Sequence, residues 1–442
     1  GSSCSQAPKK KPPTTDKVEN AEDSEDRIRK IQVPIQSGPT KSPMKNTFVD
    51  YTKAWGLEGV SGTHLYAVDW NADGFVDLVT LPEYYGQPEF YIGSTKGFKK
   101  AESSPLPYGL RASLLTFADF NKDGIKDLLV ATLNQKTELN KDPLRLLLGK
   151  KKKGSVVYTE IENAFPPTPY PTASVSIVDV NMDGWLDIYL GNWFDTSQSR
   201  PELVPDRIYL GQAGGKKWDD GSYLLIGELE YSNSEEVFLQ ATPTFGTSVC
   251  DIDQNGYPDI LSASSSGYKN MVWLNLRDRE NNDRKLVDQA KIMGMSEDRD
   301  GAFSKTGGGQ SFYMLCQDYN NDGFMDVAMG ELFHSYDPES RDRSSILTGK
   351  GRLFPPQFIR TEYHKDDGSG SWSQGDRRAV WADFNFDGNI DLIVENSGFP
   401  PKSRLVYFEQ ADDHGYADKA EDYGIDIVNP SGSVILDVDK DG

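Results

Sequence analysis

The sequence predicts an all-β fold, a seven-bladed β-propeller of four-stranded blades whose last blade is incomplete in this chain. Three observations support this: a nine-residue motif that recurs, apolar segments on both sides of each copy, and another apolar segment behind each copy. The motif reads D-x-N-x-D-G-x-x-D at Asp179–Asp187. Further copies begin at Asp69, Asp119, Asp251, Asp318 and Asp383, and a shortened seventh begins at Asp437.

The apolar segments around each motif are predicted to be strands. Leu65–Val68 precedes the first copy and Leu78–Val79 follows it, so the motif forms the turn of a hairpin. A third strand follows, such as Ile208–Gly211, and several repeats add a fourth, such as Val156–Ile161. The motifs recur at intervals of 50 to 72 residues, which accommodate one four-stranded unit each. Such units repeated around an axis are propeller blades.

The two ends of the repeat region suggest how the ring closes. Residues 47–52, ahead of the first motif, resemble a fourth strand that lacks a blade of its own. We expect this segment to be the fourth strand of the last blade. The seventh motif stops at Gly442 before its final Asp, so we expect that blade to be incomplete.

Each motif carries oxygen-bearing side chains at positions one, three, five and nine. Side chains at alternate positions converge when the backbone winds around a point, and the Gly at position six permits a sharp turn. A backbone carbonyl at position seven and the carboxylate at position nine complete an all-oxygen shell, which suits Ca²⁺ before Mg²⁺. An EF-hand would require a Glu at position twelve and flanking helices. The alternative is an Asx-rich hairpin turn without metal.

Composition excludes some classes of function. The net charge of −21 argues against nucleic acid, because phosphates would be repelled. No apolar run reaches the roughly 18 residues that a membrane-spanning helix needs. The three cysteines, Cys4, Cys250 and Cys316, are odd in number and imply no disulfide framework. We expect Cys250 and Cys316 to be buried free thiols in the first strands of consecutive repeats.

Residues 1–44 differ from the propeller region, residues 45–442, and are predicted to be a flexible tether. They contain a Lys-Pro run and a mixed-charge segment with few apolar residues. Ser2–Ser5 resembles the processed end of a bacterial lipoprotein signal peptide, with Cys4 as the lipidated residue. The alternative is that Gly1–Ser3 is a cloning remnant.

Further residues carry a resemblance to a known family. They are Phe48–Leu57 ahead of the first motif, and Gly307–Phe312 leading into Gln317–Gly323. With the repeated motif, they resemble FG-GAP/VCBS repeat proteins, whose blades are related to the integrin α propeller, and in particular the branch of ASPIC/UnbV and cartilage acidic protein. The resemblance covers about residues 46 to 442.

The resemblance implies several calcium ions, about one per blade, bound in the first hairpin loop. Carried over residue by residue, it assigns side-chain ligands and, at position seven, backbone carbonyls. These residues are Asp69, Asn71, Asp73, Phe75 and Asp77; Asp119, Asn121, Asp123, Ile125 and Asp127; Asp179, Asn181, Asp183, Trp185 and Asp187; Asp251, Asp253, Asn255, Tyr257 and Asp259; Asp318, Asn320, Asp322, Phe324 and Asp326; Asp383, Asn385, Asp387, Asn389 and Asp391; and Asp437, Asp439 and Asp441. The fourth motif exchanges the Asp and Asn positions, so weaker binding is expected there.

We expect a non-enzymatic, exported scaffold for protein interaction or adhesion, in which calcium is structural. It would face the periplasm or the cell surface as a lipoprotein anchored through Cys4, within a larger envelope or surface assembly. The long insertions at residues 192–205 and 331–343 are candidate partner contacts. A lectin-like propeller that binds a glycan is the first alternative. A polysaccharide-acting enzyme is the second, although the four histidines lack metal-ligand spacing and no nucleophile motif is present.

Overall fold

A computed structural model of the protein describes residues 48–133, 144–152, 154–166, 171–196, 201–227, 230–232, 235–237, 241–278, 283–296, 309–332, 344–362, 376–396, 404–411, 414–425, 427–430 and 432–438. The chain divides into two units, residues 1–44 and 45–442. The predicted tether and Cys4 lie outside the described residues.

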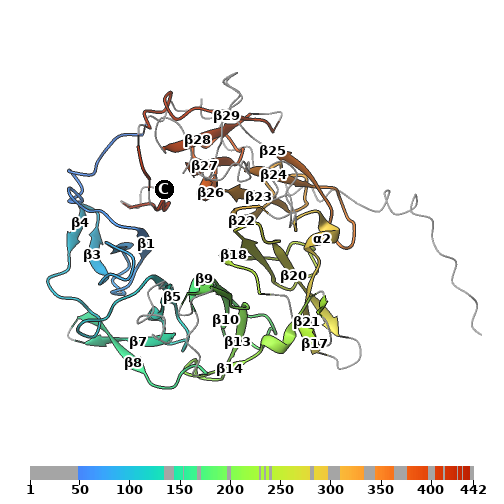
Figure 1. Ribbon diagram of the computed structural model, residues 1–442. Helices are drawn as coiled ribbons and strands as arrows, with labels where there is room; N and C mark the ends of the chain where they lie inside the picture. The colour runs from blue at the N-terminus through green and yellow to red at the C-terminus, as the bar shows by residue number, and fades with distance from the viewer. Residues whose placement is uncertain are drawn as a thin grey trace, which may run out of the picture. The chain divides into compact units, whose positions relative to one another are not determined.

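Six antiparallel sheets follow one another around a central axis, and the first strand of each sheet lies nearest that axis (Figure 1). The prediction of an all-β propeller with four-stranded blades is thereby confirmed for six blades. Blades one and two contain β1 (His64–Val68), β2 (Asp77–Leu81), β3 (Glu89–Ser94) and β4 (Gly97–Lys100), then β5 (Leu114–Ala118), β6 (Asp127–Ala131), β7 (Arg145–Lys152) and β8 (Ser155–Ile161). Blades three and four contain β9 (Thr172–Val178), β10 (Asp187–Asn192), β13 (Arg207–Gly211) and β14 (Trp218–Asp220), then β18 (Thr244–Cys250), β19 (Asp259–Ser264), β20 (Met271–Asp278) and β21 (Asp283–Asp288). Blades five and six contain β22 (Ser311–Gln317), β23 (Asp326–Glu331), β24 (Ser345–Gly349) and β25 (Phe358–Glu362), then β26 (Asp376–Ala382), β27 (Asp391–Asn396), β28 (Leu405–Gln410) and β29 (Tyr416–Asp418).

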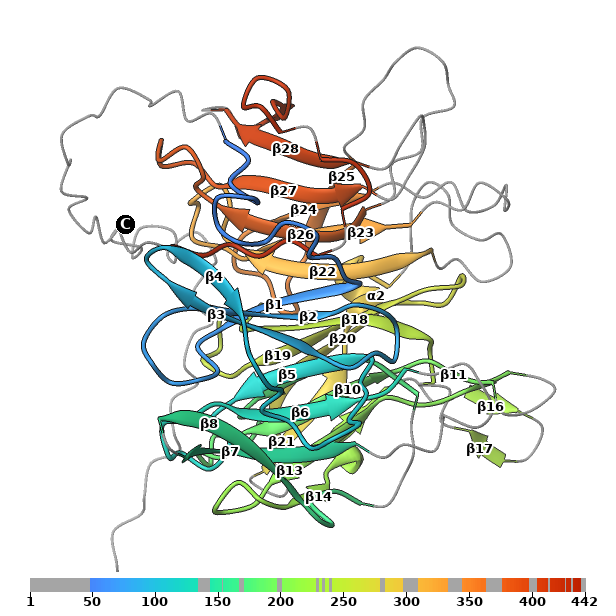
Figure 2. The same ribbon diagram turned by 90° about the vertical axis from the view of Figure 1, so that its left-hand side faces the viewer.

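Short elements are inserted around blades three and four. The strand β15 (Leu225–Ile226) pairs in parallel with β21 and makes the fourth sheet five-stranded. Two small hairpins are formed by β11 (Phe194–Asp195) with β12 (Glu202–Leu203) and by β16 (Glu230–Ser232) with β17 (Glu235–Val237). The described residues also include two short helices, η1 (Ser222–Leu224) and α2 (Ala290–Met293). In the side view, β11, β16 and β17 lie on the side away from the β3–β4 hairpin (Figure 2).

The core lies between neighbouring blades. Every residue of β2, β6, β10, β19, β23 and β27 is buried, because a neighbouring blade or, at the two ends of the row of blades, a packed segment covers each face of these second strands. One cluster, for example, joins Leu81 and Phe90 of blade one to Leu128 and Leu147 of blade two. Burial on both faces explains why the two residues after the first Asp are apolar in all six strands rather than alternating.

A seventh blade is not confirmed. No strand follows β29 within the described residues. Val434, Leu436 and Val438 nevertheless pack against the face of blade one that is turned away from blade two, while Ile435 between them is 50% exposed. This alternation is typical of an extended segment with one face buried.

Two predictions on individual segments are wrong. Residues 48–52 form no strand; instead the Phe48 N–H donates to the Tyr423 carbonyl (2.8 Å), and its ring packs on Tyr407 of blade six. Cys250 and Cys316 do lie at the ends of the first strands of consecutive blades, the last residue of β18 and the last but one of β22, but they are joined by a disulfide rather than free, with Cα atoms 6.2 Å apart. The thiols meet because β18 and β22 lie side by side at the axis.

Candidate metal centre

The six complete motifs occupy the same turn in six blades, between the first and the second strand. The Asp at position nine is in each case the first residue of the second strand. The backbone is left-handed (φ between 55° and 94°) at positions four and six of all copies. Glycine supplies position six, where this conformation is free of strain. Position four is Ala72, Lys122, Met182, Gln254, Asn321 or Phe386.

The side chains at positions one, three and five fold back over the loop. In blade three, the Asp183 N–H donates to both Asp179 Oδ1 and Asn181 Oδ1 (3.0 Å each), and the Gly184 N–H donates to Asp179 Oδ2 (2.8 Å). Asp183 Oδ1 in turn accepts the N–H of Trp185 at position seven (2.8 Å). The other five loops repeat these bonds, so the oxygens at positions one and three face the backbone N–H of position five in all six turns.

The Asp at position nine fixes the loop to the body of the blade. Asp187 is 0% exposed; its Oδ2 accepts the Val180 N–H (2.9 Å) and its Oδ1 accepts the Gly211 N–H from the third strand (2.7 Å). The corresponding third-strand donors are Gly93, Gly149, Asn275, Gly349 and Gln410. A buried carboxylate with two backbone donors holds the hairpin and the third strand in one register.

These third-strand residues were not predicted as part of the site. A Cβ on Gly211 would lie 2.4 Å from the Leu186 carbonyl oxygen, so glycine is what allows the third strand to approach. Blades four and six use longer side chains differently. Asn275 Nδ2 donates to the Val180 carbonyl (2.8 Å) and Gln410 Nε2 to the Tyr319 carbonyl (3.2 Å), both in the motif of the preceding blade. Four of the six donors are glycines in the third strand, and this recurring glycine in the sequence could have identified the position.

Burial changes the acidity of the position-nine carboxylates. Loss of hydration raises the pKa of Asp187 to about 7, and the bonds from Gly211 and Val180 lower it only in part. The same cause raises the pKa to about 7 in Asp77, Asp259 and Asp326, to about 6 in Asp127, and above its usual range in Asp391. Within the described chain, no Lys, Arg or His side chain bonds these six carboxylates. A cation in the loop would therefore favour the ionised form that burial disfavours.

The fourth loop tests whether such an ion fits. Oxygens of Asp251, Asp253 and Asp259 lie within 4.8 Å of one another. The exchange of Asp and Asn in this motif therefore keeps three carboxylates together. Asn255 at position five still bonds both Asp251 and Asp253 through its backbone N–H. An all-oxygen, carboxylate-rich set of this kind fits a hard divalent cation.

The structure does not bring every predicted ligand into a loop. Asp437 lies exposed beyond β29, whereas Asp439 and Asp441 lie outside the described residues. The position-seven residues are placed with their N–H toward position five, as Trp185 shows. The ligand roles of all these residues remain predictions.

Neighbouring loops are also linked around the ring. The Lys122 ammonium of loop two lies 4.1 Å from the ring centroid of Trp185 in loop three. Gln254 Nε2 of loop four donates to the Gly323 carbonyl of loop five (2.9 Å). The Cys250–Cys316 disulfide joins the strands that lead into the same two loops.

Comparison with known proteins agrees with this geometry. Residues 69–130 match the FG-GAP-like repeat family. Integrin alpha-3 of Mus musculus is 29% identical over 176 residues, which cover 35% of this chain and 14% of the integrin; the protein of Cricetulus griseus is 28% identical over the same length and shares. The chain thus spans a small part of the length of these relatives. The predicted resemblance to FG-GAP-like repeats and integrin α chains is confirmed.

Solved structures with similar folds include the Dos1 propeller and the V. cholerae biofilm matrix protein Bap1. The first has a TM-score of 0.39 at 13% identity and covers 74% of this chain and 64% of its own. The second has a TM-score of 0.35 at 9% identity and covers 81% and 58%.

Proposed function

We propose that this chain is a non-enzymatic interaction scaffold whose propeller is stabilised by Ca²⁺ in the first loop of each blade. The observation that carries the proposal is the set of six fully buried position-nine carboxylates, each at the base of a loop of further oxygen donors and none bonded to a basic side chain in the described chain. When bound, the ion would supply the positive charge that these loops lack, and it would stabilise the folded chain because only the folded chain assembles the site.

The insertions offer a surface for a protein partner. The β10–β13 connection, which contains the predicted contact region 192–205, leaves from the end of a second strand and therefore lies at the end of the blade opposite the motif loop. Its described part includes Trp193 and Phe194, whose rings are 5.5 Å apart and half-buried. Partly exposed aromatic side chains on loops suit protein interfaces. The second candidate, residues 331–343, lies largely outside the described residues.

An exported protein is the setting that fits best. A disulfide between Cys250 and Cys316 is expected to persist in an oxidising compartment rather than in a reducing cytosol. Among the described residues, no helix combines the length and apolar character needed to cross a membrane. Lipidation of Cys4 would then supply the membrane anchor.

The test is thermal unfolding with metal counting. The full chain is melted with excess Ca²⁺, with EGTA, and with EGTA plus excess Mg²⁺, while native mass spectrometry counts bound ions. We expect about six Ca²⁺ per chain and a large loss of melting temperature with EGTA that Mg²⁺ does not restore. Unchanged melting with no bound ion would reduce the loops to metal-free turns and contradict the proposal.

A further inference from the structure

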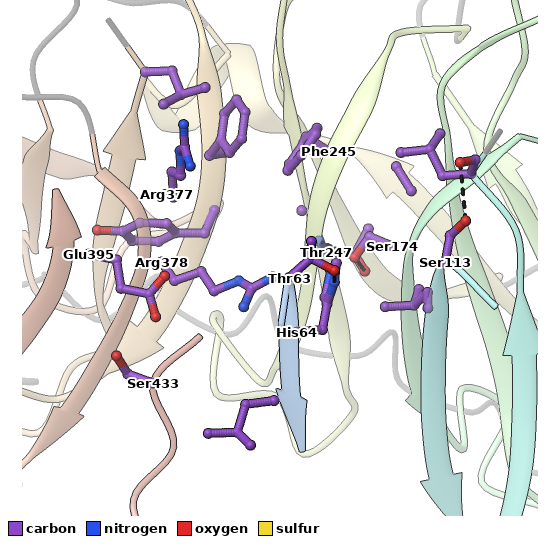
Figure 3. Close-up of a pocket in the computed structure, with 18 of the residues that line it drawn as sticks. Thr63, His64, Ser113, Ser174, Phe245, Thr247, Arg377, Arg378, Glu395 and Ser433 are labelled. Atoms are coloured by element: carbon purple, nitrogen blue, oxygen red, sulfur yellow. Dashed lines mark hydrogen bonds between the residues drawn. The ribbon is translucent and has the colours of Figure 1, made fainter. Parts of the chain in front are cut away.

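The end of the central channel opposite the motif loops contains a cavity of about 640 Å³. Residues at the start of all six first strands line one cavity, so all six strands begin at this mouth. Residues near the start of these strands line the cavity, among them Thr63 and His64 of β1, Ser113 and Ser174 (Figure 3). The cavity is therefore separated from the metal loops by the length of a strand.

Four consecutive first strands are irregular at this mouth. In β9, β18 and β22 the register shifts by one residue, and the additional residues are Ala173, Phe245 and Phe312. In β26, Arg377 and Arg378 together oppose Glu395 of β27. β1 and β5 pair with their neighbours without such a shift. A β-bulge adds a residue and redirects side chains, and bulges are frequent beside functional sites.

All these additional residues line the cavity, so the bulges determine its chemistry. On the side of β18 and β22, the rings of Phe245 and Phe312 lie 3.8 Å apart and are half-buried. Trp193 extends this aromatic surface, 5.5 Å from Phe245. On the β26 side the bulge supplies two guanidinium groups. The wall is therefore apolar in one sector and cationic in the next.

The charges at the mouth do not cancel. Within the described chain, the guanidinium groups of Arg377 and Arg378 form no ion pair and donate no hydrogen bond. Figure 3 shows Arg378 extended between Glu395 and His64. Glu395 is buried and accepts the Gly432 N–H (2.9 Å). Burial first, and the Arg378 charge second, lower the pKa of His64 to about 4, so this imidazole is neutral at pH 7. Among the side chains that line the cavity itself, two arginines and one glutamate leave one positive charge.

We propose that this mouth binds a monoanionic carboxylate carried on an aromatic body. The carboxylate would pair with Arg377 and Arg378, whose planar forks match its geometry, and the aromatic body would stack on Phe245 and Phe312. A single net positive charge matches a carboxylate better than a phosphate dianion. The ligand comes either as a free aromatic acid or as the C-terminal carboxylate of a polypeptide with an aromatic last residue. The proposal goes beyond the scaffold function and does not depend on calcium.

The experiment is calorimetric titration of the full chain, in excess Ca²⁺, with phenylacetate and with its neutral isostere phenylacetamide. We expect phenylacetate to bind and the amide to bind at least about tenfold more weakly, since a hydrogen bond to a charged group is worth about that factor or more. R378Q should reduce phenylacetate affinity by about tenfold for the same reason. The control is R352Q, the same charge change at an exposed residue of the β24–β25 turn beside the motif loops. It should leave the affinity unchanged.

A second pair of ligands identifies the source of the carboxylate. Acetyl-Gly-Gly-Phe with a free C-terminus is compared with the same peptide as its C-terminal amide. Tighter binding of the free peptide than of phenylacetate indicates a polypeptide terminus, and the reverse indicates a free acid; either supports the site. No binding of any acid, equal binding of acid and amide, or equal losses in R378Q and R352Q would overturn it. Because Ca²⁺ is present throughout and ion counting is separate, this failure would leave the calcium proposal standing.

Discussion

Asp183→Asn replaces one carboxylate in the loop of blade three with an amide of nearly the same size. The amide oxygen of Asn can still accept the Trp185 N–H, which Asp183 Oδ1 accepts at 2.8 Å. The backbone N–H of residue 183 continues to bond Asp179 and Asn181. The substitution therefore keeps the backbone bonds of the turn and removes one of the three negative charges in that loop. It also removes the bond that Asn181 Nδ2 donates to Asp183 Oδ2 (3.0 Å), with or without calcium.

The expected effect follows from binding linkage. An ion that binds only the folded chain stabilises it by RT ln(1 + [L]/Kd), which is about 1.4 kcal/mol for one site when Ca²⁺ is tenfold above Kd. A variant whose third loop no longer binds should lose up to about 1.4 kcal/mol of calcium-dependent stability and one ion of about six. Any difference in unfolding free energy between wild type and variant that persists in EGTA does not come from the ion.

The assay is urea unfolding of wild type and variant, each with Ca²⁺ and with EGTA, so that the quantity compared is the difference between the two conditions. The control is Asp219→Asn, which makes the same charge change at an exposed position of β14 in the same blade. If Asp183→Asn and Asp219→Asn lose the same calcium-dependent free energy, or if neither loses an ion, the loop is not the binding site and the reasoning is refuted.

Two further predictions concern the protein body. Burial raises the pKa of Asp206 to about 6, so the folded chain binds this proton more tightly than the unfolded chain does. The contribution of this group to the unfolding free energy should therefore rise by about 3 kcal/mol as pH falls from above 6 toward 4. Urea unfolding at successive pH values should show that Asp206→Asn removes this part of the pH dependence. An identical pH dependence in the variant would contradict the prediction. The Cys250–Cys316 disulfide closes a loop with a sequence separation of 66 residues. Reduction of this disulfide should lower the unfolding free energy by about 4 kcal/mol. A reductant should not change the unfolding free energy of a C250S/C316S double variant. If the reductant has the same effect on both proteins, the bond does not form.

Much of the fold could be predicted because each copy of one motif marks a turn and the two strands that flank it. Each motif predicted a hairpin, and Asp187 duly begins β10 after a loop whose oxygens converge. The third strands were predictable for a similar reason: a short apolar segment follows the motif in each repeat, although at a variable distance. The order of the sheet follows, since strands that are successive in the chain pair as neighbours.

The remainder depends on contacts that no local pattern records. The disulfide arises because two strands distant in sequence lie together at the axis, and three cysteines alone do not show which of them meet. Phe48 was expected to pair as a strand, but its ring finds a buried partner in Tyr407 instead. A bulge is equally invisible, because Phe245 in an otherwise regular segment does not reveal that its partner strand is one residue shorter there.

The direction of the first strands separates the two kinds of site in this propeller. A motif loop can form only where a first strand ends, because its position-nine Asp must begin the second strand and meet the third. That geometry tolerates little change, as the 2.4 Å approach of a Cβ at Gly211 to the Leu186 carbonyl shows. At the other end, where the first strands begin, buried acids such as Glu331 also accept backbone N–H groups, but the bulges that introduce Phe245 or Arg378 there leave the motif loops unchanged. Calcium-dependent stability and ligand specificity should therefore respond to different substitutions, the first to those after a first strand and the second to those at its start.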